Sequence, residues 1–111
     1  MKPCVVIDDQ GHCWPTQIAD RFGDRLRGWI ARRPSSDTQA LLFLGCHAVH
    51  FMGTPFALQV FFLSADGRVL SRVERAPWGR PAVSSMAFAT LEIPLQLVDA
   101  AWRPERFTWK R

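Results

Sequence analysis

The stretch LQVFFLSADGRVLSRVER, residues 58–75, decides the fold class of this chain. Residues 60–63 are all apolar, which is typical of a strand buried on both faces. Asp66-Gly67 follows, and this dipeptide favours a hairpin with a two-residue type I′ turn. Residues 69–74 mix apolar and polar side chains, which indicates a half-exposed partner strand. The turn then sets a register in which three pairs lie opposite each other: Val60 with Val73, Phe62 with Ser71, and Leu63 with Leu70.

Further strands are predicted on both sides of this hairpin. Short apolar runs bounded by turn residues indicate strands or strand pieces at residues 4–7, 40–44, 47–52 and 86–93. Residues 8–15 contain two Asp, a Gly and a Pro and are expected to form a turn. Residues 76–82 contain two Pro and a Gly and are expected to form a loop. Two interpretations stay open for residues 95–102. One is a helix with apolar positions at 95, 98 and 102, and the other is a strand-like alternation of apolar and polar residues at 95–97.

One segment has a helical period. In residues 16–33, apolar side chains at positions 18, 22, 26, 29 and 30 share one helix face, with Thr16 as N-cap and Pro34 beyond the end. We therefore predict a mainly β (α+β) fold. It consists of a compact antiparallel β-barrel or jelly-roll-like sheet, with one amphipathic helix near the N-terminus.

Size and composition fit one globular domain, residues 1–111. Hydrophobic residues make up 48% of the 111 residues and charged residues 22%, which excludes a disordered chain. The net charge is +4, and basic and aromatic residues interleave at 102–111 as they do in single-strand nucleic-acid binders. Basic residues elsewhere are scattered among acidic ones. We therefore expect a packed or frayed terminal segment and no nucleic-acid partner.

The termini and the cysteines indicate a compartment. No 7–15-residue apolar signal core is visible, and no run approaches the 18 apolar residues of a membrane span. The expected location is therefore the cytoplasm. Three cysteines at irregular spacing make a poor disulfide framework, so reduced thiols are expected, although a Cys4–Cys13 bridge is conceivable.

The stretch Cys46-His47-Ala48-Val49-His50 is the most suggestive for chemistry. On a helix, Cys46 and His50 would share one face and could hold a metal ion. On a strand they would lie roughly 13 Å apart at about 3.3 Å per residue, too far for one ion. The favoured interpretation is a small core cysteine and a hydrogen-bonded histidine, so no metal or other cofactor is expected. A nucleophile–base pair of Cys46 and His50 lacks a visible third group.

Two other side chains are candidates for a site. Glu92 lies between Leu91 and Ile93 in an apolar strand, where a carboxyl is unusual without a partner. The favoured interpretation is a rim carboxylate or an ion pair with an arginine, and a site carboxylate is the alternative. Trp78, in a Pro-Trp-Gly-Arg loop, is interpreted as a loop anchor or as a cap on a ligand cleft.

Together these motifs resemble a known family. In order, they are Arg25-x-x-Gly28, residues 40–43, Cys46, Val49-His50, Gly53, residues 60–63, residues 66–70, residues 77–80 and Leu91-Glu92. Their order and spacing are similar to those of the small prokaryotic proteins called domain of unknown function 192, over about residues 16–93, followed by a divergent tail at 94–111. Four positions depart from the family pattern: Phe51 stands where Thr is usual, Thr54 where Met is, and Gln59 and Ser64 where Asp is.

The resemblance implies a compact β-rich fold but no established reaction. Our first hypothesis is a non-enzymatic module that binds a small ligand or a protein partner at a surface formed by Arg25, His50, Gly53 and Trp78. The alternative is a small enzyme with His50 as acid/base, assisted by Glu92 or Cys46.

Overall fold

The structure is a computed structural model that describes residues 1–21, 23–24, 28–29, 32–45, 48–49, 54–84 and 86–110. Its strands are β1 (Lys2–Asp8), β2 (Cys13–Ile18), β3 (Ala40–Leu44), β4 (Ala48–Val49), β5 (Leu58–Leu63), β6 (Val69–Arg75), β7 (Ala82–Val83), β8 (Ala89–Pro94) and β9 (Phe107–Lys110). A short 3-10 helix, η1, spans Leu95–Leu97.

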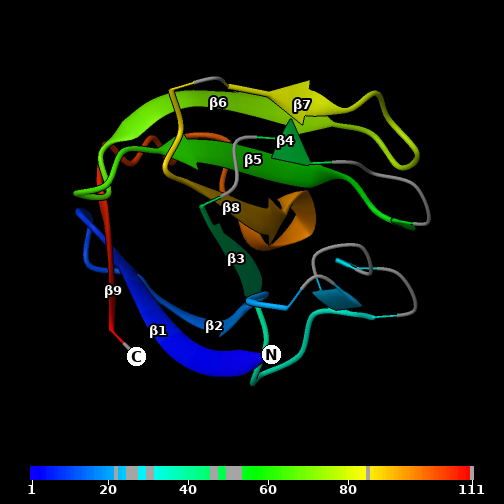
Figure 1. The fold of residues 1–111 in the computed structure, drawn as a ribbon, viewed down its shortest axis with the longest axis horizontal. Helices are drawn as coiled ribbons and strands as arrows, with labels where there is room; N and C mark the ends of the chain where they lie inside the picture. The colour runs from blue at the N-terminus through cyan, green and yellow to red at the C-terminus, as the bar shows by residue number, and fades with distance from the viewer. Residues whose placement is uncertain are drawn as a thin grey trace.

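Seven strands form one curled sheet in the order β6-β5-β8-β3-β2-β1-β9, and β4 pairs with β7 in a small second sheet. All neighbours are antiparallel except β2 and β3, which run parallel. The large sheet bends into a half-barrel, which Figure 1 shows with β5, β8 and β3 forming its spine. The mainly β prediction is therefore confirmed.

The hairpin at 58–75 forms, with one difference in register. Val60 lies opposite Val73 and Phe62 opposite Ser71, as predicted, but Leu63 lies opposite Val69 because a β-bulge follows Phe62. The turn is not type I′. Only Gly67 in it has positive φ, at 85°, and its N–H bonds to the Ser64 carbonyl at 2.9 Å while Ser64 N–H bonds to Arg68. This is a three-residue loop with a glycine bulge, a geometry in which Asp66 keeps a negative φ and only the glycine needs a positive one.

Most of the other predicted strands are present. Residues 4–7 lie in β1, residues 40–44 form β3, and residues 86–93 overlap β8, which extends through Pro94. The predicted turn at 8–15 is shorter, because β2 already begins at Cys13. Within the predicted piece at 47–52, residues 48–49 form β4 and the others lie outside the described residues. Of the open segment 95–102, only Leu95–Leu97 is helical, as a 3-10 turn.

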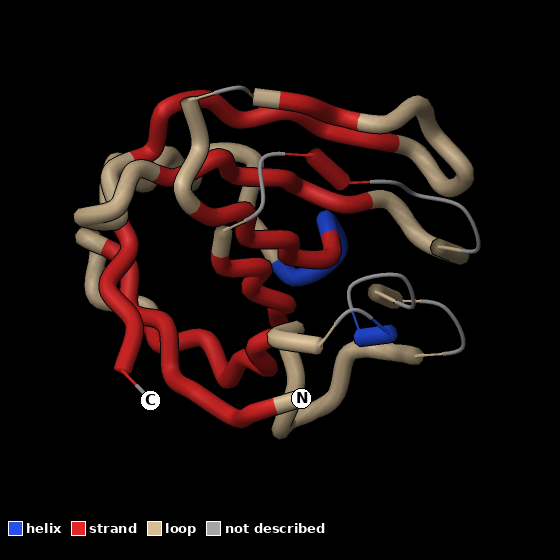
Figure 2. Tube along the Cα trace, viewed as in Figure 1, coloured by secondary structure: helices blue, strands red, loops and turns tan. Residues whose placement is uncertain are grey.

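The predicted amphipathic helix at 16–33 is not supported. Its first three residues belong to β2, where Thr16 is buried and its hydroxyl donates to the Trp14 carbonyl at 2.7 Å instead of capping a helix. Strand pairing with both β1 and β3 satisfies this backbone, so tertiary contacts override the helical period. Among the described residues from 19 to 34, only positions 23 and 24 have helical backbone (Figure 2).

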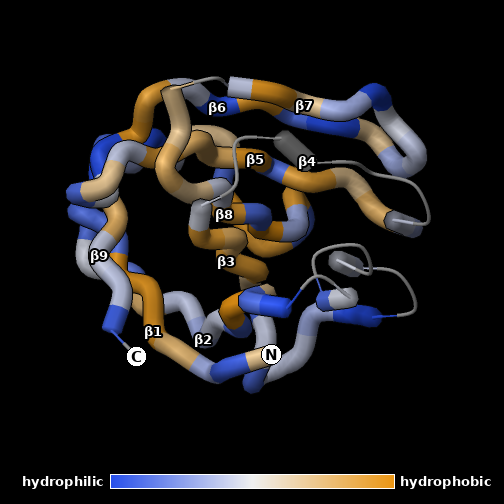
Figure 3. Tube along the Cα trace, viewed as in Figure 1, coloured by the Kyte–Doolittle hydropathy of each residue, from blue (hydrophilic) through white to orange (hydrophobic). Residues whose placement is uncertain are grey.

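Apolar residues follow one another along β3, β5 and β8, which are largely orange in Figure 3, and their side chains form clusters on both faces of the curled sheet. Successive residues of these central strands alternate between two clusters. The inner cluster lies inside the curl and contains Cys4, Val6, Trp14, Ile18, Ala40, Leu42, Phe61, Leu63, Ala89, Leu91, Ile93, Trp102 and Phe107. The outer cluster contains Ala19, Trp29, Leu41, Phe43, Leu58, Val60, Phe62 and Ala82.

The C-terminal segment closes one end of the half-barrel. β9 pairs with β1, and Phe107 N–H bonds to the Gly67 carbonyl at 2.8 Å on the hairpin turn. The rings of Trp102 and Phe107 are buried in the inner cluster. The terminal segment is therefore packed, as expected, and these two rings have no face free to stack on a nucleic-acid base.

Candidate functional site

Glu92 lies on β8 at the centre of the sheet, with its side chain on the outer face. Its cross-strand neighbours are Leu41 on β3 and Val60 on β5, both members of the outer cluster. The residue is 2% exposed. No hydrogen bond or ion pair to its carboxyl is formed by any residue in the described ranges. The interpretation of Glu92 as a rim carboxylate is therefore wrong, and no described arginine pairs with it.

Burial decides the charge state of this carboxyl. Loss of hydration disfavours the charged form and raises the pKa of Glu92 from its ordinary value of 4.5 to about 8. At neutral pH the group is therefore mostly a neutral acid. A neutral carboxyl carries one O–H donor and one carbonyl acceptor, so it can bind a partner through either function.

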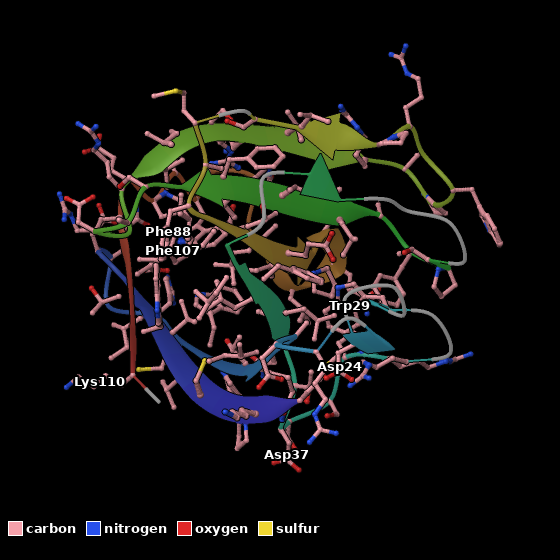
Figure 4. All side chains as sticks on the ribbon, in the orientation of Figure 1. Asp24, Trp29, Asp37, Phe88, Phe107 and Lys110 are labelled. Atoms are coloured by element: carbon pink, nitrogen blue, oxygen red, sulfur yellow. The ribbon has the colours of Figure 1, made fainter. Side chains whose placement is uncertain are left out.

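A second unpaired polar group occurs in the same layer. The Trp29 ring belongs to the outer cluster and packs edge-on against Phe56, with the ring centroids 5.3 Å apart. Its indole Nε1 is buried and has no hydrogen-bond partner among the residues that the structure describes. Figure 4 places Trp29 between the sheet and the loops that face it. A buried N–H without an acceptor is uncommon in native proteins, so it marks a place where an acceptor is missing.

A cavity of about 440 Å³ opens beside the Phe56 ring that packs on Trp29. Arg33, Pro34, Pro55, Phe56 and Gln96 line it, so its wall includes the ring that packs on Trp29. It lies near the end of β8, where Leu95 N–H bonds to the Ala57 carbonyl at 2.9 Å. Glu92 is therefore only a few residues along β8 from the cavity mouth.

Trp78 is not a core anchor for its loop, and its predicted role as a cap on a ligand cleft stays a prediction. Its side chain is 67% exposed, and none of the larger cavities lined by described residues includes it. It stands in a tight turn in which Gly79 N–H bonds to the Ala76 carbonyl at 3.0 Å, and its φ of 60° lies in the left-handed region. It neither anchors the loop in the core nor caps a described cleft.

The remaining candidates, Arg25, Cys46, His50 and Gly53, lie outside the residues that the structure describes. Their distances to Glu92 and Trp78 therefore stay predictions. Among described residues, no group of three or more His, Cys, Asp and Glu side chains could hold a metal ion.

The other two cysteines do not pair with each other. The register places Cys4 opposite Thr16 and Cys13 opposite Ile7, and no bond joins them.

Gln59, one of the departures from the family pattern, belongs to another network. It is buried on the inner face, where its Nε2 donates to the Val73 carbonyl at 3.1 Å and its Oε1 accepts from Arg72 Nη2 at 2.8 Å. The Arg72 guanidinium lies over the Phe61 ring, 5.2 Å from its centroid. Because neighbouring strand positions alternate in face, Gln59 and Glu92 are on opposite sides of the sheet. Position 59 is thus separate from the Glu92 site.

Sequence reasoning missed the buried carboxylate of Asp8. Its Oδ2 accepts from the indole N–H of Trp14 at 3.2 Å and from that of Trp102 at 2.9 Å. Its Oδ1 accepts from the backbone N–H of Gln10 at 2.7 Å and of His12 at 3.1 Å. This network joins β1, β2 and the C-terminal segment, so its role is structural. The only local signal was an Asp placed at the end of a strand before a turn.

Comparison with known proteins places the chain in a family without an assigned reaction. A protein of unknown function from Novosphingobium aromaticivorans DSM 12444 has 22% identity and a TM-score of 0.74, over 96% of this chain and 84% of that one. A putative transcription regulator from Sinorhizobium meliloti 1021 has 20% identity and a TM-score of 0.68, over 97% of this chain and 92% of that one. At these identities the likeness shows a shared fold.

No curated protein matches the chain. No helix among the described residues is long and apolar enough to cross a membrane. The model of the family DUF192, described as Uncharacterized ACR, COG1430, matches residues 5–101, a wider range than the 16–93 expected from the motifs. Since this match spans most of the sequence, the chain belongs to the DUF192 family.

Proposed function

We propose that the chain is a non-enzymatic binding module that recognises a small molecule on the outer face of the half-barrel, with Glu92 as the recognising group. The observation that carries this proposal is the buried Glu92 carboxyl, which has no partner in the described part of the chain. Burying a polar group without a hydrogen bond costs stability, and such sites are kept where a ligand supplies the missing partner.

The chemistry of the site favours a ligand with a basic nitrogen. A protonated amine or amidine would donate hydrogen bonds to the Glu92 carboxylate, and its positive charge would stabilise the ionised form that burial disfavours. Because the pKa of unliganded Glu92 is about 8, binding such a cation at neutral pH would release a proton from the protein. An acceptor elsewhere on the ligand would satisfy the Trp29 indole N–H.

The cavity beside Phe56 provides a route to this group. Pro94 lies opposite Leu58 and on the same face of β8 as Glu92, two residues away or about 7 Å along the strand. The cavity lined by Arg33, Phe56 and Gln96 opens near this strand end. A small ligand entering there would contact the Phe56 ring and two prolines, and it would have to extend past Pro94, about 7 Å along the strand, to reach Glu92.

Benzamidine and propylamine are suitable probes, measured by NMR titration of the wild-type protein and of two variants. The affinity of the wild-type protein should rise about tenfold for each unit by which the pH is increased towards 8, because a larger fraction of Glu92 is then deprotonated. Glu92→Gln should remove this pH dependence and most of the binding. Glu74→Gln, which changes an exposed carboxyl on β6, is the matched control and should behave like wild type. Equal binding by wild type and Glu92→Gln would refute the proposal.

A small enzyme with His50 as acid/base, assisted by Glu92 or Cys46, is the second candidate. The pKa of Glu92 favours it, because proton transfer is most efficient when the pKa of the group is near the working pH. If His50 and Glu92 interact, Glu92→Gln should shift the His50 titration measured by NMR, whereas Glu74→Gln should not. An unchanged His50 titration would remove the case for this pair.

A further inference from the structure

The segment around β7 forms an exposed edge that the Glu92 site does not use. We define the β7 rim as the described residues 76–84 and 86. In Figure 1 this segment, drawn in yellow, runs along the edge of the molecule beside β6. Three large apolar side chains on it face solvent: Trp78 is 67% exposed, Val83 65% and Met86 81%. These exposed apolar side chains are spread along one segment and give this edge of the molecule an apolar character.

The backbone conformation of Trp78 indicates that its exposed side chain serves an external contact. The hydrogen bond from Gly79 N–H to the Ala76 carbonyl closes a turn with Pro77 at its second position. Since the proline ring holds φ negative, the positive φ of Trp78 makes this a type II turn. Glycine is the usual residue at that position. A bulky tryptophan there is strained and gains no burial within the described structure, which is the pattern of a residue held for an external contact.

The charge of the rim selects the kind of partner. Residues 75–91 contain two arginines, Arg75 and Arg80, and no acidic residue. Arg80 is exposed, and its carbonyl accepts from Arg75 Nε at 3.1 Å, which fixes the base of the loop. The preceding acidic residue, Glu74, lines a cavity with Arg103 on the inner side of the sheet. The rim is therefore cationic as well as apolar.

We propose that the β7 rim binds the surface of an anionic lipid bilayer, with Trp78 inserted at the interface and Arg80 near the phosphates. Tryptophan is favoured at the boundary between water and hydrocarbon, and cationic side chains are attracted to anionic headgroups. An acidic peptide would share this charge preference but needs a groove. Four cavities lined by described residues lie around Arg106, Gln96, Arg103 and Trp109, and none of them includes a residue of the rim. Protruding side chains without a groove fit a bilayer better.

Vesicle co-sedimentation tests the proposal with the full chain. The probes are phosphatidylcholine vesicles with and without phosphatidylglycerol, at low and physiological salt. The wild-type protein should bind the anionic vesicles and not the neutral ones. Arg80→Glu should weaken partitioning by on the order of tenfold or more. Lys110→Glu makes the same change in net charge on β9, at the opposite side of the molecule in Figure 4, and should have little effect.

Matched apolar variants separate insertion from simple charge attraction. Val83→Asp on the rim should weaken binding, whereas Val5→Asp, at an exposed valine of β1, should change it less. Brominated lipids should quench the emission of the wild-type protein much more than that of Trp78→Phe. Trp14, Trp29 and Trp102 are buried, and the half-buried Trp109 lies on β9, away from the rim. Circular dichroism of each variant confirms that it is folded.

Three results would overturn the proposal. The first is no binding of the wild-type protein to anionic vesicles at low salt. The second is equal weakening by Arg80→Glu and Lys110→Glu, which would indicate non-specific attraction by net charge. The third is tight binding of an acidic, hydrophobic peptide without vesicle binding, which would assign the rim to a protein partner.

Discussion

Replacing Glu92 by glutamine tests the central feature of this molecule, a carboxyl buried in the apolar outer layer. Glutamine has nearly the same shape as the neutral acid but cannot ionise. In the unfolded chain Glu92 has an ordinary pKa of 4.5, and in the folded protein burial raises the pKa to about 8. Between these values the folded state binds more protons than the unfolded state. Stability is therefore greatest below pH 4.5 and is lost as pH rises through 8.

The size of the effect follows from the two pKa values. Each pH unit between them costs about 1.4 kcal/mol of unfolding free energy. Because Glu92 ionises more readily in the unfolded chain, the free energy of unfolding is lower by about 3 kcal/mol at pH 7 and by about 5 kcal/mol well above pH 8 than it is below pH 4.5. Glu92→Gln has no such loss. We expect the variant to be within about 1 kcal/mol of wild type at pH 5 and several kcal/mol more stable at pH 8.

Urea denaturation followed by tryptophan fluorescence measures this difference at pH values from 5 to 9. Glu74→Gln is the control, because its carboxyl is exposed on β6 and its replacement should leave the pH profile parallel to that of wild type. A difference between wild type and Glu92→Gln that does not change with pH would refute the reasoning, since it would mean that Glu92 does not titrate in this range.

Other predictions concern the turns and the buried carboxylate. Trp78→Gly should be about 1 kcal/mol more stable than Trp78→Ala, because alanine keeps the Cβ that clashes at positive φ; equal thermal midpoints would contradict the strained turn. Gly67→Ala should cost about 2 kcal/mol or more, because φ is 85° and a Cβ there overlaps the Phe107 carbonyl oxygen. Urea denaturation should show this loss of unfolding free energy, and a loss of only a few tenths of a kcal/mol would contradict the prediction. Asp8→Ala should cost about 3 kcal/mol by leaving two indole and two backbone N–H groups without an acceptor, and Asp8→Asn less. Similar stability of both Asp8 variants and wild type would show that the network contributes little.

The candidate site was only partly predictable from sequence. The unusual carboxyl in an apolar strand identified Glu92, but its burial and its lack of a described partner depend on β3, β5 and the outer cluster. Trp29 was placed on the apolar face of the predicted helix, and it is buried, yet the lack of a described partner for its N–H is visible only in the structure. The exposure and positive φ of Trp78 were likewise invisible, because a Pro-Trp-Gly pattern fits a buried anchor as well as a protruding turn.

The sequence by itself determined the local features of the fold. The hairpin at 58–75 and the strands at 4–7 and 40–44 follow from short apolar runs and turn chemistry, which act between neighbours in the chain. The tertiary structure decided the rest: strand β2 in place of a helix at 16–18, the bulge after Phe62, and the closing strand β9. Each of these depends on backbone hydrogen bonds or packing with segments far away in sequence. A local pattern states which residues share a face, but only long-range contacts decide how deeply that face is buried.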